Sequence, residues 1–247
     1  MNFDEHSLDI GNPSPAQSAG QARADIEIPN KKKPTDKVLL ASILALLILF
    51  GSVLGFVVFL NTRAPPTLDD LHDTNLEGDL EGSQGRMFSG YSFINLDGFW
   101  YTQLKSPKGG RFYDMALRYS PWEVEMYPIE GELDAENFNN AKNYSVTFNP
   151  TGTDFSHVAL AIGDFNEHMT KIFNKVPIAA CDRNETSACE GRPIVNCDSD
   201  EDVIFYVKEA EETKISFNDN CILIEGAGLD LVKSTDRVLY ELYGILG

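Results

Sequence analysis

Three acidic residues alternate along a short polar segment near the carboxyl end. Asp198, Asp200 and Asp202 stand at positions one, three and five of a calcium-binding loop, and Glu209 stands at position twelve. Carboxylate oxygens at this spacing are typical Ca²⁺ ligands. However, Val203 occupies the position that needs glycine, and the residues after it have the composition of a strand. We expect an acidic turn, with weak calcium binding at Asp198, Asp200 and Asp202 as the alternative.

A second group of residues could bind a metal ion or move protons. His157, Asp164 and His168 recur at helical spacing, so they share one side of a predicted helix. That side also carries Lys171 and Lys175 and points away from the apolar stripe of the same helix. We therefore expect these three residues to belong to a solvated helix face.

All four cysteines lie between residues 181 and 221. In an extracytoplasmic domain the expected state is disulfide, and four cysteines allow three pairings. We favour Cys181–Cys189, which closes a local loop, and Cys197–Cys221, which joins two predicted strands. A zinc site is disfavoured because zinc ligands usually come in C-x-x-C pairs, and no two cysteines here are that close.

Two Asn-X-Ser/Thr sequons begin at Asn143 and Asn184. Asn184 lies in a polar loop between Cys181 and Cys189, where a glycan would be accessible. Both asparagines are therefore candidate glycosylation sites.

The sequence patterns of common enzymes are missing. The chain has no G-x-S-x-G, H-E-x-x-H or phosphate-binding P-loop pattern. Gly226-Ala227-Gly228 follows an apolar run, but Leu231 stands where a dinucleotide-binding turn needs its third glycine, so we expect a strand-to-helix turn. The sequence assigns no catalytic residue and no cofactor, and a non-enzymatic role is favoured.

The most distinctive element is an apolar segment. Val38–Leu60 contains 23 uncharged, mostly apolar residues, which would span roughly 34 Å as a helix, enough to cross a bilayer. A cleaved signal peptide is disfavoured because its apolar core is usually about 7–15 residues long. Gly51 and Gly55 form a G-x-x-x-G pair, so a homodimer through this helix is a possible arrangement.

The flanking charges predict the orientation of this helix. Lys31–Lys33 and Lys37 precede it closely, whereas Arg63 is the only cation that follows it before Arg86. Basic flanks stay on the cytoplasmic side. We expect a single-pass protein of the cell membrane, with its amino end in the cytoplasm and its carboxyl part outside.

Charge and composition narrow the possible functions. The 247 residues include 20 basic and 38 acidic side chains, a net charge of −18, and residues 61–247 hold 15 basic and 32 acidic ones, a net charge of −17. This sign disfavours nucleic acid as a partner and predicts repulsion from anionic lipid headgroups. The apolar content of 43% disfavours a wholly disordered chain.

Composition divides the chain into four parts. Residues 1–37 lack periodicity and predict a disordered cytoplasmic tail, and 38–60 form the transmembrane helix. Residues 61–86 contain two prolines and six acidic residues, which predicts an acidic stalk. Residues 87–247 have the length and patterning of one extracytoplasmic domain.

Within that domain, short apolar runs alternate with turn residues. Asp97-Gly98 predicts a hairpin, and two segments with helical periodicity run over Phe155–Val176 and Leu229–Gly244. The fold class is therefore α+β, one mixed or antiparallel sheet with two long helices on one face. The aromatic residues Trp100, Tyr101, Trp122 and Tyr127 are expected in its core. The predicted strands are Phe88–Ile94, Phe99–Leu104, Phe112–Leu117, Val124–Ile129, Tyr144–Phe148, Val176–Ala180, Pro193–Val195, Val203–Lys208, Lys214–Phe217 and Cys221–Glu225.

Several segments of this domain together resemble a group of uncharacterised archaeal single-pass membrane proteins with an acidic, four-cysteine outer domain. The resemblance covers most of Gly98–Gly247 and neither the tail nor the stalk. It implies an outward-facing domain with paired cysteines, and it carries no activity and no catalytic residue. The segments are Gly98–Thr102, Pro121–Glu125, Pro177–Cys181, Asn184–Thr186, Gly191–Val195, Cys197, Asn220–Ile222, Leu231–Lys233 and Asp236–Gly244.

Three hypotheses for function follow. The first is a membrane-anchored cell-envelope protein whose acidic outer domain binds a partner, such as another envelope protein, or contributes to a surface structure. The second is a membrane-tethered extracytoplasmic hydrolase that uses Asp, Glu or a bound cation. The third is a calcium-dependent binding or adhesion module.

Overall fold

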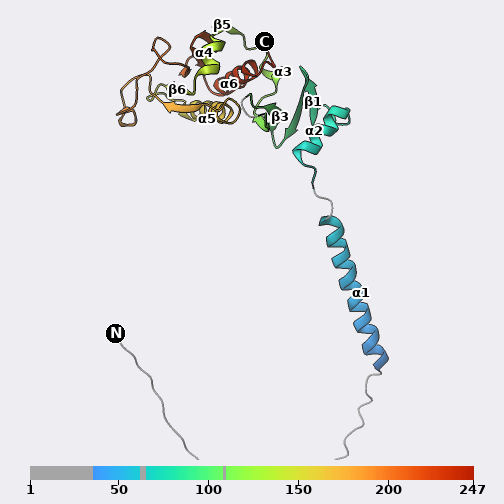
Figure 1. Cartoon of the computed structure of the whole chain (residues 1–247). Helices are drawn as coiled ribbons and strands as arrows, with labels where there is room; N and C mark the ends of the chain where they lie inside the picture. Colours follow the sequence, from blue (N-terminus) through green and yellow to red (C-terminus); the bar gives the residue numbers. More distant parts are fainter. Residues whose placement is uncertain (1–35, 62–64, 108–109) are drawn as a thin grey trace, which may run out of the picture. The chain divides into compact units, whose positions relative to one another are not determined.

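The computed structural model describes residues 36–61, 65–107 and 110–247. The chain divides into two units, Met1–Ala64 and Pro65–Gly247, which we describe separately (Figure 1). Residues 1–35, the larger part of the predicted cytoplasmic tail, lie outside the described residues.

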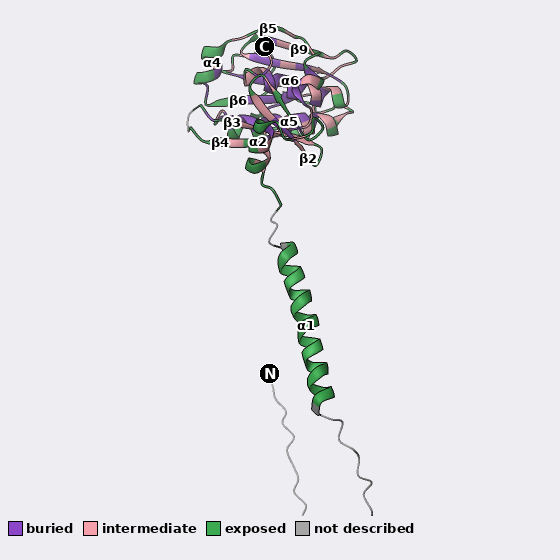
Figure 2. Ribbon diagram, turned by 90° about the vertical axis from the view of Figure 1, so that its right-hand side faces the viewer, coloured by how far each residue is buried: buried purple, intermediate pink, exposed green. Residues whose placement is uncertain are grey.

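The first unit contains helix α1, Asp36–Asn61. Within it, Lys37–Leu60 has a mean hydropathy of 2.9 and is the one helix of the described residues that is long and apolar enough to cross a membrane. Its side chains are exposed throughout (Figure 2). A Cβ added at Gly51 or Gly55 would meet no atom within 4 Å, so this face is open, and the homodimer stays a prediction.

The second unit contains an antiparallel sheet of four consecutive strands. The predicted hairpin joins the second and third strands at Asp97 and Gly98, whose φ angles are +53° and +83°. Positive φ at both turn positions matches the right-handed twist of the paired strands. The strands are β1 (Gly85–Phe88), β2 (Tyr91–Leu96), β3 (Phe99–Lys105) and β4 (Phe112–Leu117).

The prediction of an acidic stalk over residues 61–86 is wrong for Leu68–Glu77. These residues form helix α2, which packs on β1 and β2. Its buried residues are polar: the His72 Nδ1 and the Asn75 Nδ2 each lie 2.8 Å from the Ser92 hydroxyl. This face is held by hydrogen bonds and has no apolar stripe. The sequence therefore lacks the apolar periodicity that would have predicted a helix here. The folded unit therefore begins at Pro65, not at Met87.

A second, six-stranded sheet follows, so the single sheet predicted from the sequence is wrong. Its order is β5-β9-β10-β8-β6-β7, with β6, β7, β8 and β10 parallel, β9 antiparallel to β10 and β5 parallel to β9. The sheet is therefore mixed. The strands are β5 (Ile129–Leu133), β6 (Asn143–Phe148), β7 (Val176–Ala179), β8 (Ile204–Glu209), β9 (Lys214–Asp219) and β10 (Cys221–Gly226).

Between the two sheets lies a helix that overlaps the predicted strand Val124–Ile129 at Val124. Residues 121–124 form helix α3, Pro121–Val124, and only Ile129 of the predicted strand Val124–Ile129 belongs to β5. Ser120 and Glu123 form a capping box around a proline at the first helical position, and both features favour a helix start.

The two long helices are confirmed as α5, Phe155–Lys171, and α6, Leu229–Leu242. Both pack against the six-stranded sheet, and contacts with β4 and α3 join them to the other sheet. They therefore lie between two sheets, where buried residues gather (Figure 2). The remaining helices are α4, Ala135–Asn140, and the short 3-10 turn Ser187–Cys189.

The other face of the six-stranded sheet is covered by loops that carry the disulfides. The structure contains Cys181–Cys189 and Cys197–Cys221, the pairing that the sequence favoured. A small apolar cluster that includes Val195 and Ile204 lies beneath these loops. The predicted strand Pro193–Val195 is reduced to an isolated bridge between Ile194 and Cys181.

We predict that Gly131→Ala weakens the second unit. Gly131 has a φ of +81°, and an added Cβ would lie 2.1 Å from the Phe217 carbonyl oxygen of the paired strand β9. Thermal unfolding followed by tryptophan fluorescence should show a loss of at least about 2 kcal/mol. Gly163→Ala in α5 is the matched control, since its Cβ would meet no atom within 4 Å. Equal stability of the two variants would contradict the β5–β9 register.

A candidate ligand pocket

A pocket of about 550 Å³ lies between α4, β5 and the end of α6. Strand β5 places Ile129 and Leu133 on it, and α4 contributes Phe138. Helix α4 begins where the Asp134 carboxylate accepts the backbone N–H groups of Glu136 and Asn137, a side-chain cap that fixes the start of this wall.

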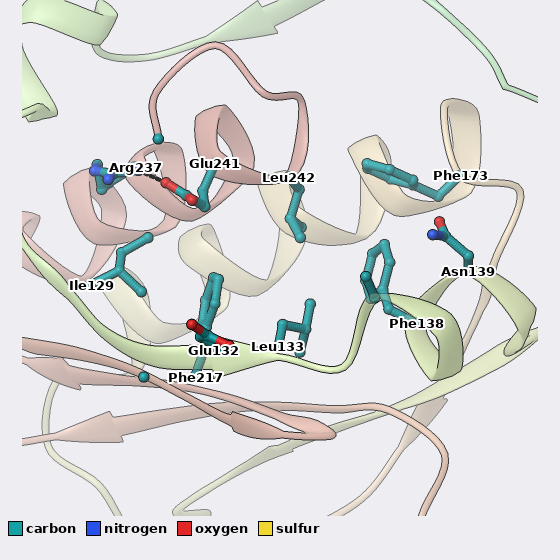
Figure 3. Close-up of a pocket in the computed structure, with 13 residues that line it drawn as sticks. Ile129, Glu132, Leu133, Phe138, Asn139, Phe173, Phe217, Arg237, Glu241 and Leu242 are labelled. Carbon is teal, nitrogen blue, oxygen red and sulfur yellow. Dashed lines mark hydrogen bonds and ion pairs between the residues drawn. The ribbon is translucent and has the colours of Figure 1, made fainter.

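The pocket is lined by both apolar and polar side chains. Its apolar lining is Ile129, Leu133, Phe138, Phe173, Phe217 and Leu242. Figure 3 shows Arg237 and Glu241 at one end and Phe173 and Asn139 at the other. This combination of an apolar wall with a few convergent polar groups is typical of small-molecule sites.

The end of the pocket with Arg237 and Glu241 is formed by one turn of α6. The Arg237 Nη1 donates to the Glu241 Oε2 over 2.8 Å, an i,i+4 ion pair. Arg237 is only 9% exposed, and its Nε is buried without a hydrogen-bond partner among the described residues. A buried donor without an acceptor is unfavourable and is uncommon in folded proteins. Glu241 therefore pairs with one nitrogen of a largely buried guanidinium whose Nε has no partner among the described residues.

Next to Arg237 in the sequence, Asp236 points to a different part of the interior. Its Oδ2 accepts the backbone N–H groups of Arg118 and Tyr119 over 2.9 and 2.8 Å, just after β4. Burial raises the pKa of Asp236 to about 8. These hydrogen bonds join α6 to the end of the four-stranded sheet. Asp236 does not line the pocket.

The row of His157, Asp164 and His168 is not the solvated face that the sequence predicted. His168 is buried, its Nδ1 lies 2.6 Å from the Tyr243 hydroxyl and its Nε2 lies 3.0 Å from the Ala116 carbonyl oxygen. Burial lowers the pKa of His168. The helix face is buried here because β4 covers it.

The other two residues of that row contact different partners. Asp164 accepts two hydrogen bonds from the Arg118 guanidinium, over 2.6 and 3.2 Å. His157 Nδ1 lies 2.5 Å from the Asp154 carboxylate at the start of α5. The three side chains therefore do not form one site.

The predicted calcium residues are not brought together. No group of three or more His, Cys, Asp or Glu side chains in the described part of the chain is placed to hold a metal ion, and this includes Asp198, Asp200 and Asp202. Glu209, at position twelve of the loop pattern, instead accepts the N–H groups of Thr153 and Asp154 at the start of α5. The calcium hypothesis is therefore not supported.

The remaining sequence-predicted residues lie on the surface or around the core. Asn143 and Asn184 are both exposed, at the start of β6 and in the loop closed by Cys181–Cys189. Glycosylation stays a prediction at both. Gly226 and Gly228 form a strand-to-helix turn between β10 and α6, as expected.

Three of the four aromatic residues that we expected in the core pack against it. These are Trp100, Trp122 and Tyr127, and the two indole rings meet edge to face with centroids 4.8 Å apart. Tyr101 is partly buried and lies outside this cluster.

We predict that Asp236→Asn removes a pH dependence of stability. The folded carboxyl, with its pKa of about 8, keeps a proton that the unfolded chain releases above about pH 4. The wild-type stability from this group is therefore present below about pH 4 and is lost as the pH rises toward 8, whereas the Asn variant cannot lose it. Between pH 5 and 8, the thermal midpoint of the variant should rise relative to wild type.

The comparison isolates Asp236 because every other titratable group, including His168, is present in both proteins and contributes equally to their pH dependence. Asp198→Asn, which changes an exposed carboxylate, is the control and should keep the wild-type slope. The same slope in wild type and Asp236→Asn would contradict a protonated Asp236.

The pocket residues were not among the sequence predictions. Besides the row Leu229, Val232, Leu239 and Leu242, the residues Leu231, Val238 and Ile245 form a second apolar row at i, i+7 and i+14. Two such rows indicate a helix buried on more than one side, and they could have identified Arg237 as a buried cation.

No protein-family model, no curated protein and no solved structure matches this chain.

Proposed function

We propose that this chain is a single-pass membrane protein of the cell envelope that presents the Pro65–Gly247 unit outside the cytoplasm for binding. The observation that carries the proposal is the pairing of all four cysteines in the unit that follows α1. Disulfides persist in oxidising compartments and are rare in the cytoplasm. The lysine-rich segment before α1 favours the same orientation.

The charge of the outer unit supports a binding role and limits the partner. With 15 basic and 32 acidic side chains after residue 60, its field favours a partner with a basic contact surface, such as another envelope protein. The same field opposes contact with nucleic acid and with anionic headgroups.

The hydrolase alternative has no comparable support. Burial raises the pKa of the Asp236 carboxyl and lowers the pKa of the His168 imidazole. Both side chains are hydrogen-bonded inside the fold, and neither lines the 550 Å³ pocket. A catalytic acid or base must reach its substrate. We therefore propose a binding protein rather than an enzyme.

We predict that protease added to intact cells removes the outer unit. Non-reducing peptide mapping of the released fragment should recover the pairs Cys181–Cys189 and Cys197–Cys221. As the matched control, a variant with Lys31–Lys33 changed to Gln and lysines introduced at Thr62 and Ala64 reverses the basic flank and should reduce the cleaved fraction several-fold. Full protection of the wild-type unit, or four free thiols, would contradict the proposal.

A further inference from the structure

We propose that helix α2 is a clasp that acid releases: it stays packed on the four-stranded sheet while His72 is neutral, and it leaves the sheet when His72 takes up a proton. Release would add residues 65–84 to the chain that links α1 to the rest of the Pro65–Gly247 unit. This inference goes beyond the proposed function, because it concerns the response of the unit to acid and holds on either side of the membrane.

His72 is buried between α2 and the sheet, where the helix packs on β1 and β2 (Figure 1). The residue is 1% exposed. Its Nδ1 lies 2.8 Å from the Ser92 hydroxyl, and its Nε2 is buried without a hydrogen-bond partner among the described residues. Because the packed helix shields the ring from water, a proton from solvent reaches His72 only when α2 moves.

The hydrogen bonds of Ser92 determine which nitrogen of His72 carries a proton. The Asn75 Nδ2 lies 2.8 Å from the Ser92 hydroxyl and 3.4 Å from the Phe93 carbonyl oxygen. That carbonyl only accepts, so the Asn75 group beside it is the NH₂, which only donates. The Ser92 hydroxyl therefore accepts from Asn75 and donates its own proton to the His72 Nδ1. The neutral ring then carries its proton on Nε2, and a second proton at Nδ1 would displace the hydrogen bond from Ser92.

The charged groups that face His72 are acidic. They are Asp69 and Asp73 on α2 itself and Asp114 on β4. The Asp114 Oδ1 lies 3.8 Å from the His72 Nε2, which is beyond hydrogen-bond distance. These carboxylates favour a charged His72, whereas burial of the ring opposes it.

The cations of the four strands contact other groups. Arg86 of β1 lies over the Trp122 ring, and Lys105 of β3 lies over the Phe112 ring. Neither cation is among the groups that act on His72. The other strand residues that share the face covered by α2 are uncharged: Met87, Ser92, Ile94, Tyr101 and Gln103.

The balance of these effects determines the direction of the pH response. Burial lowers the pKa of His72, and the three aspartates oppose this shift only in part. Once α2 leaves the sheet, the ring is in water and regains the ordinary pKa of about 6.5. A histidine with a lowered pKa in the packed state stabilises that state above about pH 6.5, and this stability is lost as the pH falls. The packing equilibrium of α2 should therefore weaken by up to about tenfold per pH unit below that value.

The experiment measures hydrogen exchange of the full chain in phosphatidylcholine nanodiscs at about pH 7.5 and 5.5, corrected for intrinsic exchange rates. Protection of the α2 amides Leu71–Glu77 should fall about tenfold at the lower pH, whereas in His72→Asn it should change less than about twofold. Asn keeps an oxygen that accepts the Ser92 hydroxyl and takes up no proton. His157→Asn, at a partly exposed histidine of α5, is the matched control and should keep the wild-type response. Equal responses of wild type and His72→Asn would overturn the proposal.

Two further measurements separate release of α2 from unfolding of the whole unit. At about pH 5.5 the amides of β10 should stay at least about tenfold better protected than those of α2, and equal protection would contradict a local release. Imidazole NMR should give His72 an apparent pKa below about 6.5, and Asp114→Asn, which removes the nearest carboxylate, should lower it further. An apparent pKa at or above about 6.5 would refute the clasp, even if His72→Asn fails to pack α2.

Discussion

The structure of the second unit depends on a helix that is buried although it carries polar and charged side chains. Residues 234–240 of α6 are all buried, and they include Asp236 and Arg237. Buried polar groups are unfavourable without partners inside the protein, and only the Ser234 hydroxyl and the Arg237 Nε of these residues have none among the described residues. Asp236 binds the backbone after β4, and the Tyr240 hydroxyl donates to the Tyr119 carbonyl oxygen over 2.7 Å. These contacts join α6 to the four-stranded sheet, while its apolar residues pack on the other sheet.

Two neighbouring polar residues of α6 have different partners. Asp236 joins α6 to the backbone after β4, whereas Arg237 lines a pocket and pairs with Glu241 on the same helix. On the far face of the six-stranded sheet, loops that carry the two disulfides cover a small apolar cluster.

Local signals in the sequence predicted much of the fold. The hairpin at Asp97-Gly98 and the helices α5 and α6 depend on turn chemistry and periodicity within one segment. The division into two sheets depends on pairings between distant strands, such as β8 with β6 and β10, which no local pattern encodes. The pocket was harder to predict, because its lining comes from α4, β5, β9, α6 and Phe173, which lie far apart in the sequence.

Native-state hydrogen exchange of the full chain measures most directly whether α6 unites the two sheets. Amides of Phe93 in β2, Leu239 in α6 and Ile222 in β10 should open together, with the same free energy as global unfolding of the Pro65–Gly247 unit. If the four-stranded sheet exchanged through a separate opening of lower free energy, while α6 and the six-stranded sheet stayed protected, the central role of α6 would be contradicted.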